Sequence, residues 1–517
     1  MSAMSRAREP RIESVHPLRR RGFMKLAGAL LGLPAIPAAV RFAVNEQLLG
    51  EAKAFGVEGS QPTYFIEINL RDQWDFMHVF VPPGIATYTN LMRGGSGQLC
   101  TLFYGPDQLM QQPNGMYLTP DSAVLAPHLD DIAVVEHFEI CTGAIHGHES
   151  VNAMRSPGRT KASGGGKGEV WLNEPGFSEQ GNDYYYSSTP TPASLHNYYA
   201  KQLEPSLRNG ITLKYISRFH TICYYGAGLA DAELTRIQSV DQLFQTFPET
   251  VEDLNILPTP EEAQLLSSVM SRVDERFFER YGYRETARTR HASNLGEAVG
   301  LWHTGEVKIV SMPLTEDERN YWGAGVPDQV GDNKKANIWE QAAWAFKLLS
   351  NDVTRTVALE FDYLDVHETR DQSVMNTMGL QCALPLARLI ESLKAAGMWE
   401  RTTIAIFSAD GGREPAANSY GNTGKNTLVL AGGNVKGGYF GDVGVAGDTG
   451  DGHVYSYRVP DPVTGAPTAP VTDNSNRLNG AYAWRTVMKA LEIPDEVVSQ
   501  YPDVAGVQPL PFMLRNV

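Results

Sequence analysis

The chain has 517 residues, of which 42% are hydrophobic, 20% charged and 9% aromatic, as in an ordinary globular protein with a large core. This composition excludes a mainly disordered chain, and its 49 glycines follow no three-residue period, which excludes a collagen-like one. Lys and Arg number 44 against 59 Asp and Glu, so the formal net charge is −15. An acidic surface repels nucleic acid and anionic lipid, and we expect neither as a partner.

Residues 1–40 have the features of an export signal peptide. Three consecutive arginines and Lys25 precede an uncharged stretch, Leu26–Val40, which is too short to span a bilayer comfortably and contains two helix-breaking prolines. The string Arg20–Lys25 resembles the twin-arginine signal, whose substrates cross the membrane already folded. We therefore expect the twin-arginine translocase as a partner and a periplasmic or exported location. Cleavage near Ala39 and retention as a membrane anchor both stay open.

The four cysteines are Cys100, Cys141, Cys223 and Cys382, which lie far apart and form no thioredoxin-type or c-type haem motif. A substrate of the twin-arginine pathway folds in the reducing cytoplasm before export. Buried free thiols are therefore expected, although an oxidising compartment would permit disulfides.

Hydrophobic runs rich in β-branched and aromatic residues predict six strands. They lie over residues 63–70, 131–140, 212–220, 354–361, 402–407 and 427–431. Helical patterns predict helices over 260–281, 337–350 and 372–396, the last with Pro385 inside it. Strands that alternate with helices at this spacing predict an α/β fold, with a mostly parallel central sheet and helices on both faces.

The predicted organisation is a signal peptide, a linker over 41–62 and a single α/β domain over 63–517. Long polar stretches, broken by Gly and Pro, predict surface insertions in this domain. They lie near 150–192, 283–335 and 441–477.

Acidic and imidazole side chains follow four of the predicted strands. They are Asp75 and His78, His146 and His148, Asp365 and His367, and Asp410, the last followed by Arg413. In open parallel sheets ligands bind beyond the carboxyl ends of the strands, and carboxylate with imidazole suits Zn²⁺, Mn²⁺ or a harder cation. Each residue also has a simpler interpretation, as a helix N-cap or a hydrogen-bonding loop residue. Their shared position after strands favours a metal site.

Four segments together resemble a widespread bacterial family of twin-arginine exported proteins in the alkaline phosphatase and sulfatase superfamily. They are the signal within residues 1–40; Leu70–Arg71 with Asp75–Pro82; Leu364–His367; and Asp410–Pro415 followed by Leu430–Gly438. Order and spacing agree from about residue 63 to about residue 440, and the final block is the most specific match.

The resemblance implies a sulfatase-like fold with a metal site at the strand ends, where one or two cations polarise a phosphate or sulfate ester. Five side chains would provide the ligands: Asp75, His148, Asp365, His367 and Asp410. The carboxylates would neutralise the cation, and the imidazoles would bind in their neutral form. Arg413 would hold an oxyanion through two hydrogen bonds, so Arg413 and His148 are the catalytic candidates.

The chain departs from the family pattern at three places. Where the family has an Asp-His pair, this sequence has Tyr420–Asn426, and where a further His is usual it has Arg477–Tyr482. No Ser or Thr stands between Arg71 and Val81 to act as a nucleophile. We therefore expect at most one divalent metal (Zn, Mn, Ca or Mg), and a site without metal stays open. The two hypotheses are a hydrolase of phosphate or sulfate esters and a non-catalytic binding or assembly protein of the cell envelope.

Overall fold

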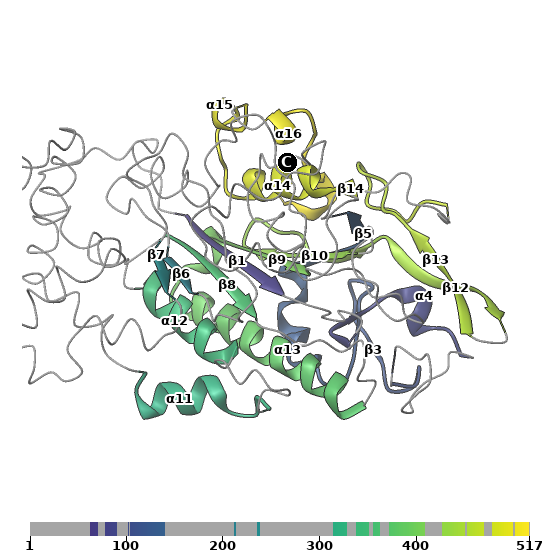
Figure 1. The fold of residues 1–517 in the computed structure, drawn as a ribbon, viewed down its shortest axis with the longest axis horizontal. Helices are drawn as coiled ribbons and strands as arrows, with labels where there is room; N and C mark the ends of the chain where they lie inside the picture. Colours follow the sequence, from purple (N-terminus) through teal and green to yellow (C-terminus); the bar gives the residue numbers. More distant parts are fainter. Residues whose placement is uncertain are drawn as a thin grey trace, which may run out of the picture. The chain divides into compact units, whose positions relative to one another are not determined.

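Figure 1 shows the fold in a computed structural model. The structure describes residues 63–70, 78–89, 102, 104–139, 211–213, 235–237, 314–327, 338–350, 355–361, 372–408, 426–449, 452–469, 478–499 and 502–515. The chain divides into two compact units, and all of these residues belong to the unit formed by Leu49–Gln242 and Pro313–Val517. The other unit, Met1–Leu48 with Leu243–Met312, lies outside the described residues.

Within the described residues, the central sheet has nine strands in the order β11-β5-β10-β9-β1-β8-β6-β7, with β14 paired to β5. Its strands are β1 (Tyr64–Leu70), β5 (Ile132–Glu139), β6 (Ile211–Leu213), β7 (Thr235–Ile237), β8 (Thr356–Phe361), β9 (Thr402–Ser408), β10 (Asn426–Gly432), β11 (Gly438–Phe440) and β14 (Leu478–Asn479). β10 runs antiparallel to both of its neighbours, and the other pairs are parallel. The predicted α/β fold with a mostly parallel sheet is confirmed.

The central strands are buried on both faces, which explains their nearly continuous hydrophobic sequences. In β1, Tyr64, Phe65, Ile66 and Ile68 are all buried, and successive side chains point to opposite faces of the sheet. Figure 1 shows α12 (Ile338–Ser350) and α13 (Gln372–Ala395) on one side of the sheet and α14 (Gly480–Ala490) on the other.

The layer on the α14 side is built from the C-terminal part of the chain. Trp484 of α14 packs edge-on against Phe65, with ring centroids 6.4 Å apart. The layer continues through α15 (Asp495–Val498), α16 (Pro502–Ala505) and the 3-10 turn η9 (Pro511–Met513). The backbone of Arg515 then donates to the carbonyl of Asn434 at 2.9 Å, so the end of the chain is bound to the turn that follows β10.

A smaller hydrophobic cluster, which includes Val81, Leu102 and Val443, lies beside the central sheet. It is formed by a three-stranded sheet of β2 (Phe80–Val81), β4 (Tyr117–Leu118) and β3 (Met110–Gln111), the short helix α4 (Pro83–Ala86), and a hairpin of β12 (Asp442–Thr449) and β13 (Gly452–Arg458). The hairpin falls within the stretch 441–477, which the sequence marked only as a polar insertion.

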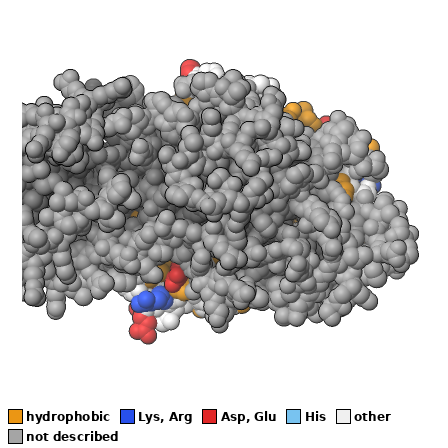
Figure 2. All heavy atoms as spheres, viewed as in Figure 1, with side chains coloured by type: hydrophobic (Ala, Val, Ile, Leu, Met, Phe, Trp, Pro, Cys, Tyr) orange, Lys and Arg blue, Asp and Glu red, His pale blue; other side chains and the backbone are white. Residues whose placement is uncertain are grey.

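The helix α11 (Glu316–Gly323) lies within the predicted insertion 283–335, where the sequence pattern predicts no helix. A capping box opens it, because Thr315 accepts from the backbone of Glu318 while Glu318 accepts from the backbone of Thr315. Trp322 is its buried residue. Figure 2 shows acidic and basic side chains over α11 on the surface. The helix is therefore mostly polar and packs on the core through one side chain.

Two of the predicted helices are found at Ile338–Ser350 and Gln372–Ala395, with Pro385 inside the second. The predicted helix 260–281, the insertion 150–192, the signal peptide 1–40 and the linker 41–62 lie outside the described residues. Among the helices that are described, none is long and apolar enough to cross a membrane. The sulfatase-like assignment of the fold stays a prediction.

Candidate functional site

Three parallel strands end at the same level of the central sheet. Leu70, the last residue of β1, is in register with Phe361, the last residue of β8, and with Ser408, the last residue of β9. The chain therefore leaves the sheet at three adjacent points of one edge, which we call the carboxyl edge. The segments that follow carry Asp75, the pair Asp365 and His367, and Asp410 with Arg413.

The last residue of β5 and the first residue of β10 also lie at the carboxyl edge. β10 is antiparallel to both β5 and β9, so β5 runs in the same direction as β9 and its last residue, Glu139, lies toward this edge. Asn426 opens β10 opposite Phe138, so the segment between Ser408 and Asn426 both starts and finishes here. These strands therefore share one carboxyl edge, as the sequence predicts.

The predicted site residues themselves are Asp75, His148, Asp365, His367, Asp410 and Arg413, and all six lie outside the described residues. Their convergence into one metal site stays a prediction. Within the part of the chain that the structure describes, no group of three or more His, Cys, Asp or Glu side chains could hold a metal ion. The donor chemistry of the predicted set, three carboxylates and two imidazoles, fits one divalent cation.

A buried polar cluster follows β1 in the chain. His78 is fully buried, and its carbonyl accepts a hydrogen bond of 2.9 Å from the hydroxyl of Thr119. The phenol of Tyr104 donates to the carboxyl of Asp121. A methyl group at Gly379 of α13 would lie 3.0 Å from the His78 carbonyl oxygen, so the helix packs closely here.

Burial dominates the ionisation of this cluster. It raises the pKa of Asp121, although the hydrogen bond from Tyr104 and the nearby His78 act in the opposite direction. It also raises the pKa of Tyr104, and Asp121 adds to that effect. Sequence reasoning noted His78 but missed Tyr104 and Asp121. The sequence signal that could have indicated a turn beside Asp121 is Pro120, at the second position of the turn Thr119–Ser122.

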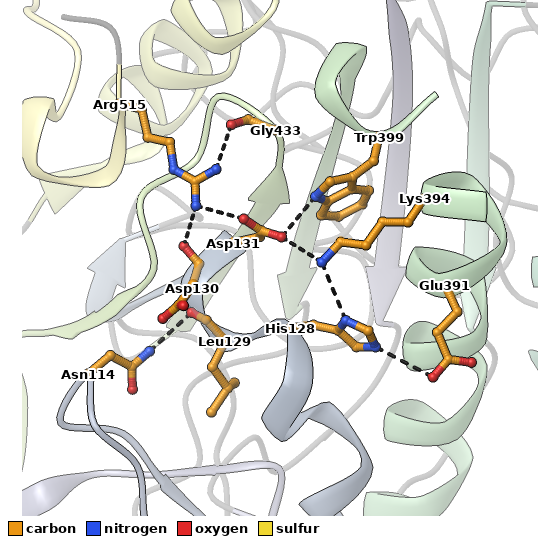
Figure 3. Close-up of polar contacts among 10 residues, drawn as sticks. All are labelled: Asn114, His128, Leu129, Asp130, Asp131, Glu391, Lys394, Trp399, Gly433 and Arg515. Carbon is orange, nitrogen blue, oxygen red and sulfur yellow. Dashed lines mark hydrogen bonds and ion pairs between the residues drawn. The ribbon is translucent and has the colours of Figure 1, made fainter. Parts of the chain in front are cut away.

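A second polar cluster lies at the opposite edge of the sheet, where β5 and β9 begin (Figure 3). The carboxylate of Asp131, the last residue of the 3-10 helix η2 (Ala123–Asp131), lies 2.7 Å from Lys394 Nζ and 2.6 Å from Arg515 Nη2. It also accepts from Nε1 of Trp399, which opens the 3-10 turn η8 (Trp399–Arg401), at 2.9 Å. We call Asp131, Lys394, Trp399 and Arg515 the Asp131 cluster.

The Asp131 cluster joins three distant parts of the chain: η2, the stretch from Lys394 to Trp399, and Arg515. Burial alone would raise the pKa of Asp131, but hydrogen bonds from Lys394, Arg515 and Trp399 outweigh it and hold the pKa below its usual value. Arg515 donates in addition to the backbone carbonyls of Gly433 at 2.9 Å and Asp130 at 2.8 Å. These contacts hold the segment that contains Arg515 against the central sheet, so the role of the cluster is structural.

The glycine-rich block Leu430–Gly438, the most specific motif of the family resemblance, lies at this same edge. A methyl group at Gly437 would lie 1.9 Å from the carbonyl oxygen of Leu129, and one at Gly433 would lie 2.3 Å from the Cα atom of Glu400. The backbone amide of Gly437 donates to the carbonyl of Asp130 at 2.8 Å. These glycines allow the chain to pack directly on η2 and η8, so the motif is explained by packing.

Residues 267–457 match a protein family of unknown function, DUF1501. The match confirms that this part of the sequence resembles a family without an assigned activity. It includes Asp365, His367, Asp410 and Arg413, whereas Asp75 and His148 lie before it.

No curated protein matches the chain. Among solved structures, that of Ps i-CgsB in complex with k-i-k-neocarrahexaose is 11% identical, covers 87% of this chain and 77% of its own, and has a TM-score of 0.30. A second structure of Ps i-CgsB is 10% identical over the same shares, with a TM-score of 0.25. At these TM-scores the likeness carries no argument about fold or activity.

Proposed function

We propose that this protein is a hydrolase of phosphate or sulfate esters that uses one divalent cation at the carboxyl edge of its sheet. The observation that carries the proposal is the register of Leu70 with Phe361 and Ser408. Because these three strands end at one level, the segments that carry the acidic and imidazole residues leave the sheet at adjacent points. A shared ligand is the simplest reason for such residues at successive strand ends.

Five residues would hold the cation: Asp75, His148, Asp365, His367 and Asp410. A bound divalent metal supplies Lewis-acid polarisation of the ester. Arg413 would pair with two non-bridging oxygens of the phosphate or sulfate, because a guanidinium matches that geometry. His148 would bind the cation through the lone pair of its neutral imidazole, so its catalytic part would be to hold the cation beside the scissile bond.

The test is metal content combined with activity. Purified protein should hold about one divalent ion per chain and hydrolyse 4-nitrophenyl phosphate or 4-nitrophenyl sulfate. Asp365→Asn should lose both the metal and the activity. Asp317→Asn, a change of the same kind at an exposed position of α11, should keep both. Chelation of the wild type should abolish turnover, and added Zn²⁺ or Mn²⁺ should restore it.

A second candidate function is a non-catalytic binding or assembly protein of the cell envelope. The observations that favour it are the missing Ser or Thr between Arg71 and Val81 and the presence of Lys425 where the family has an Asp-His pair. Protein that is free of metal, inert toward both esters and equally stable with a chelator would support this function and contradict the hydrolase.

We also propose export through the twin-arginine translocase to the periplasm or beyond. The twin arginines Arg20 and Arg21 support this, since they stand directly before the uncharged stretch of residues 26–40. Replacing both by Lys should leave the protein in the cytoplasmic fraction, whereas Arg19→Lys should not change its location. Export of the double variant at the wild-type level would contradict the proposal.

A further inference from the structure

His128 lies at the junction between η2 and α13, next to the Asp131 cluster (Figure 3). Its side chain is buried, with 6% of the residue exposed. Nδ1 lies 3.5 Å from Lys394 Nζ, and Nε2 lies 3.6 Å from Glu391 Oε1. Among the described residues, the charged groups that face His128 are therefore Lys394 and Glu391 of α13 and Asp131 of its own element.

The chemistry of these partners fixes the protonation of the imidazole. An ammonium group has donors but no acceptor, so Nδ1 of His128 must accept from Lys394 and carries no hydrogen. The ring hydrogen then sits on Nε2, which faces the carboxylate of Glu391. Protonation of Nδ1 would remove the only acceptor that His128 offers to Lys394 and would bring two cations within 3.5 Å.

Lys394 lies between His128 and Asp131 (Figure 3). Its ammonium group lies 2.7 Å from Oδ2 of Asp131, whose other oxygen lies 2.6 Å from Arg515. A charged His128 would repel Lys394, so the hydrogen bond that joins η2 to α13 at this point would become a repulsion between two cations. Arg515 would keep its own contacts with Asp131 and with the carbonyl of Asp130.

We infer that His128 makes the packing of α13 on η2 sensitive to protons: a charged imidazole loses its hydrogen bond from Lys394, repels that ammonium group and loosens the junction. The inference is independent of the proposed function, because the Asp131 cluster lies at the edge of the sheet opposite the carboxyl edge.

Burial and the neighbouring Lys394 lower the pKa of His128, and Glu391 and Asp131 oppose them. In the unfolded chain the imidazole titrates near its ordinary value of about 6.5. Between that value and the lower pKa of the folded state, the unfolded chain binds more protons, so stability falls as the pH falls through this window. The pKa of Asp131 lies below its usual value of about 4, so its own protonation belongs to a separate, more acidic range.

Hydrogen exchange measured by mass spectrometry tests the inference. Wild-type protein is compared at about pH 7.5 and about pH 5, after correction for intrinsic exchange, in peptides that cover η2 and the part of α13 around Lys394. Their protection should fall about fivefold at the lower pH, as expected for the loss of one partly exposed hydrogen bond. His128→Gln, which cannot be protonated in this range, should show no such fall.

Glu391→Gln provides an independent test, because Glu391 is exposed and its replacement should have little effect on stability. Without that carboxylate a charged His128 is less favourable, so the loss of protection should begin at a lower pH than in the wild type. Glu496→Gln, an exposed change on α15, should leave the wild-type profile unaltered. The inference is overturned if His128→Gln shows the same loss as the wild type, or if Glu391→Gln leaves its onset unmoved.

Discussion

Arg515 and Asp131 are 384 positions apart in the sequence, and their side chains lie 2.6 Å from each other. This pair links the start of β5 to the C-terminal layer, because Asp131 immediately precedes β5 and Arg515 follows the last turn of that layer. The hydrophobic core of that layer includes Phe512 and Met513, so the charged contact and the apolar one hold the same segment.

Replacing Asp131 by Ala should lower the free energy of unfolding by about 1–3 kcal/mol. The change leaves the donors of Lys394, Arg515 and Trp399 without their common acceptor, and the partial exposure of the two cations keeps the cost below that of a fully buried pair. Urea denaturation measures the difference. Asp130→Ala is the matched control, since the Asp130 side chain is exposed and only its carbonyl is used. Equal losses in the two variants would contradict the role of the Asp131 carboxylate.

The contribution of Asp131 to the free energy of unfolding should depend on pH in the acidic range. Its folded pKa is lowered, so the stabilisation is complete above the unfolded value of about 4 and disappears as the pH falls through the folded pKa. The difference in unfolding free energy between wild type and Asp131→Asn should therefore be constant near neutral pH and shrink toward zero in strong acid. A difference that persists unchanged in acid would show that the ionised carboxylate is not its source.

Asp121 should behave in the opposite way, because burial raises its pKa. The stabilisation from this group is complete below the unfolded value of about 4 and is lost as the pH rises through the folded pKa. Asp121→Asn keeps an acceptor for Tyr104 and carries no charge, so it should be more stable than the wild type at neutral pH and show no advantage in acid. Thermal unfolding at several pH values measures this. A variant less stable than the wild type at neutral pH would refute it.

The central strands could be predicted from sequence because a strand buried on both faces has a nearly continuous apolar run. The runs at 63–70, 354–361 and 402–407 match β1, β8 and β9 to within two residues. Their common direction followed from the helices predicted between strands, and β10, which is antiparallel to β9, carries no local sign of its direction.

The polar clusters could not be predicted, because each joins residues that are distant in sequence. Nothing near Asp131 points to Arg515, and nothing near Tyr104 points to Asp121. The helix α11 was missed for another reason: its single buried side chain, Trp322, gives too weak a hydrophobic period to stand out from its polar neighbours. The residues of the candidate site are predicted from their place after strands and from the family resemblance, and of that edge only the strand ends are described.

Gly437→Ala should be strongly destabilising. The added methyl group would lie 1.9 Å from the carbonyl oxygen of Leu129, a backbone atom that cannot move aside without shifting η2. We expect a loss of about 2–4 kcal/mol, in the range of severe overpacking. Gly506→Ala, where the added methyl group would meet nothing within 4 Å, should change stability by less than about 1 kcal/mol. Similar effects in the two variants would mean that close approach to η2 does not explain the glycine.

Cys382 should be unreactive in the native protein. It is a free, fully buried thiol on α13, and burial raises its pKa to about 12. Because the thiolate is the reacting species, its population at about pH 8 is far below that of an ordinary cysteine, and the surrounding core also excludes the reagent. After native treatment with iodoacetamide, the peptide containing Cys382 should stay unmodified, whereas treatment in guanidinium chloride should modify it fully. Modification of the native protein at the rate of an exposed thiol would show that α13 opens far more often than its burial in the core allows.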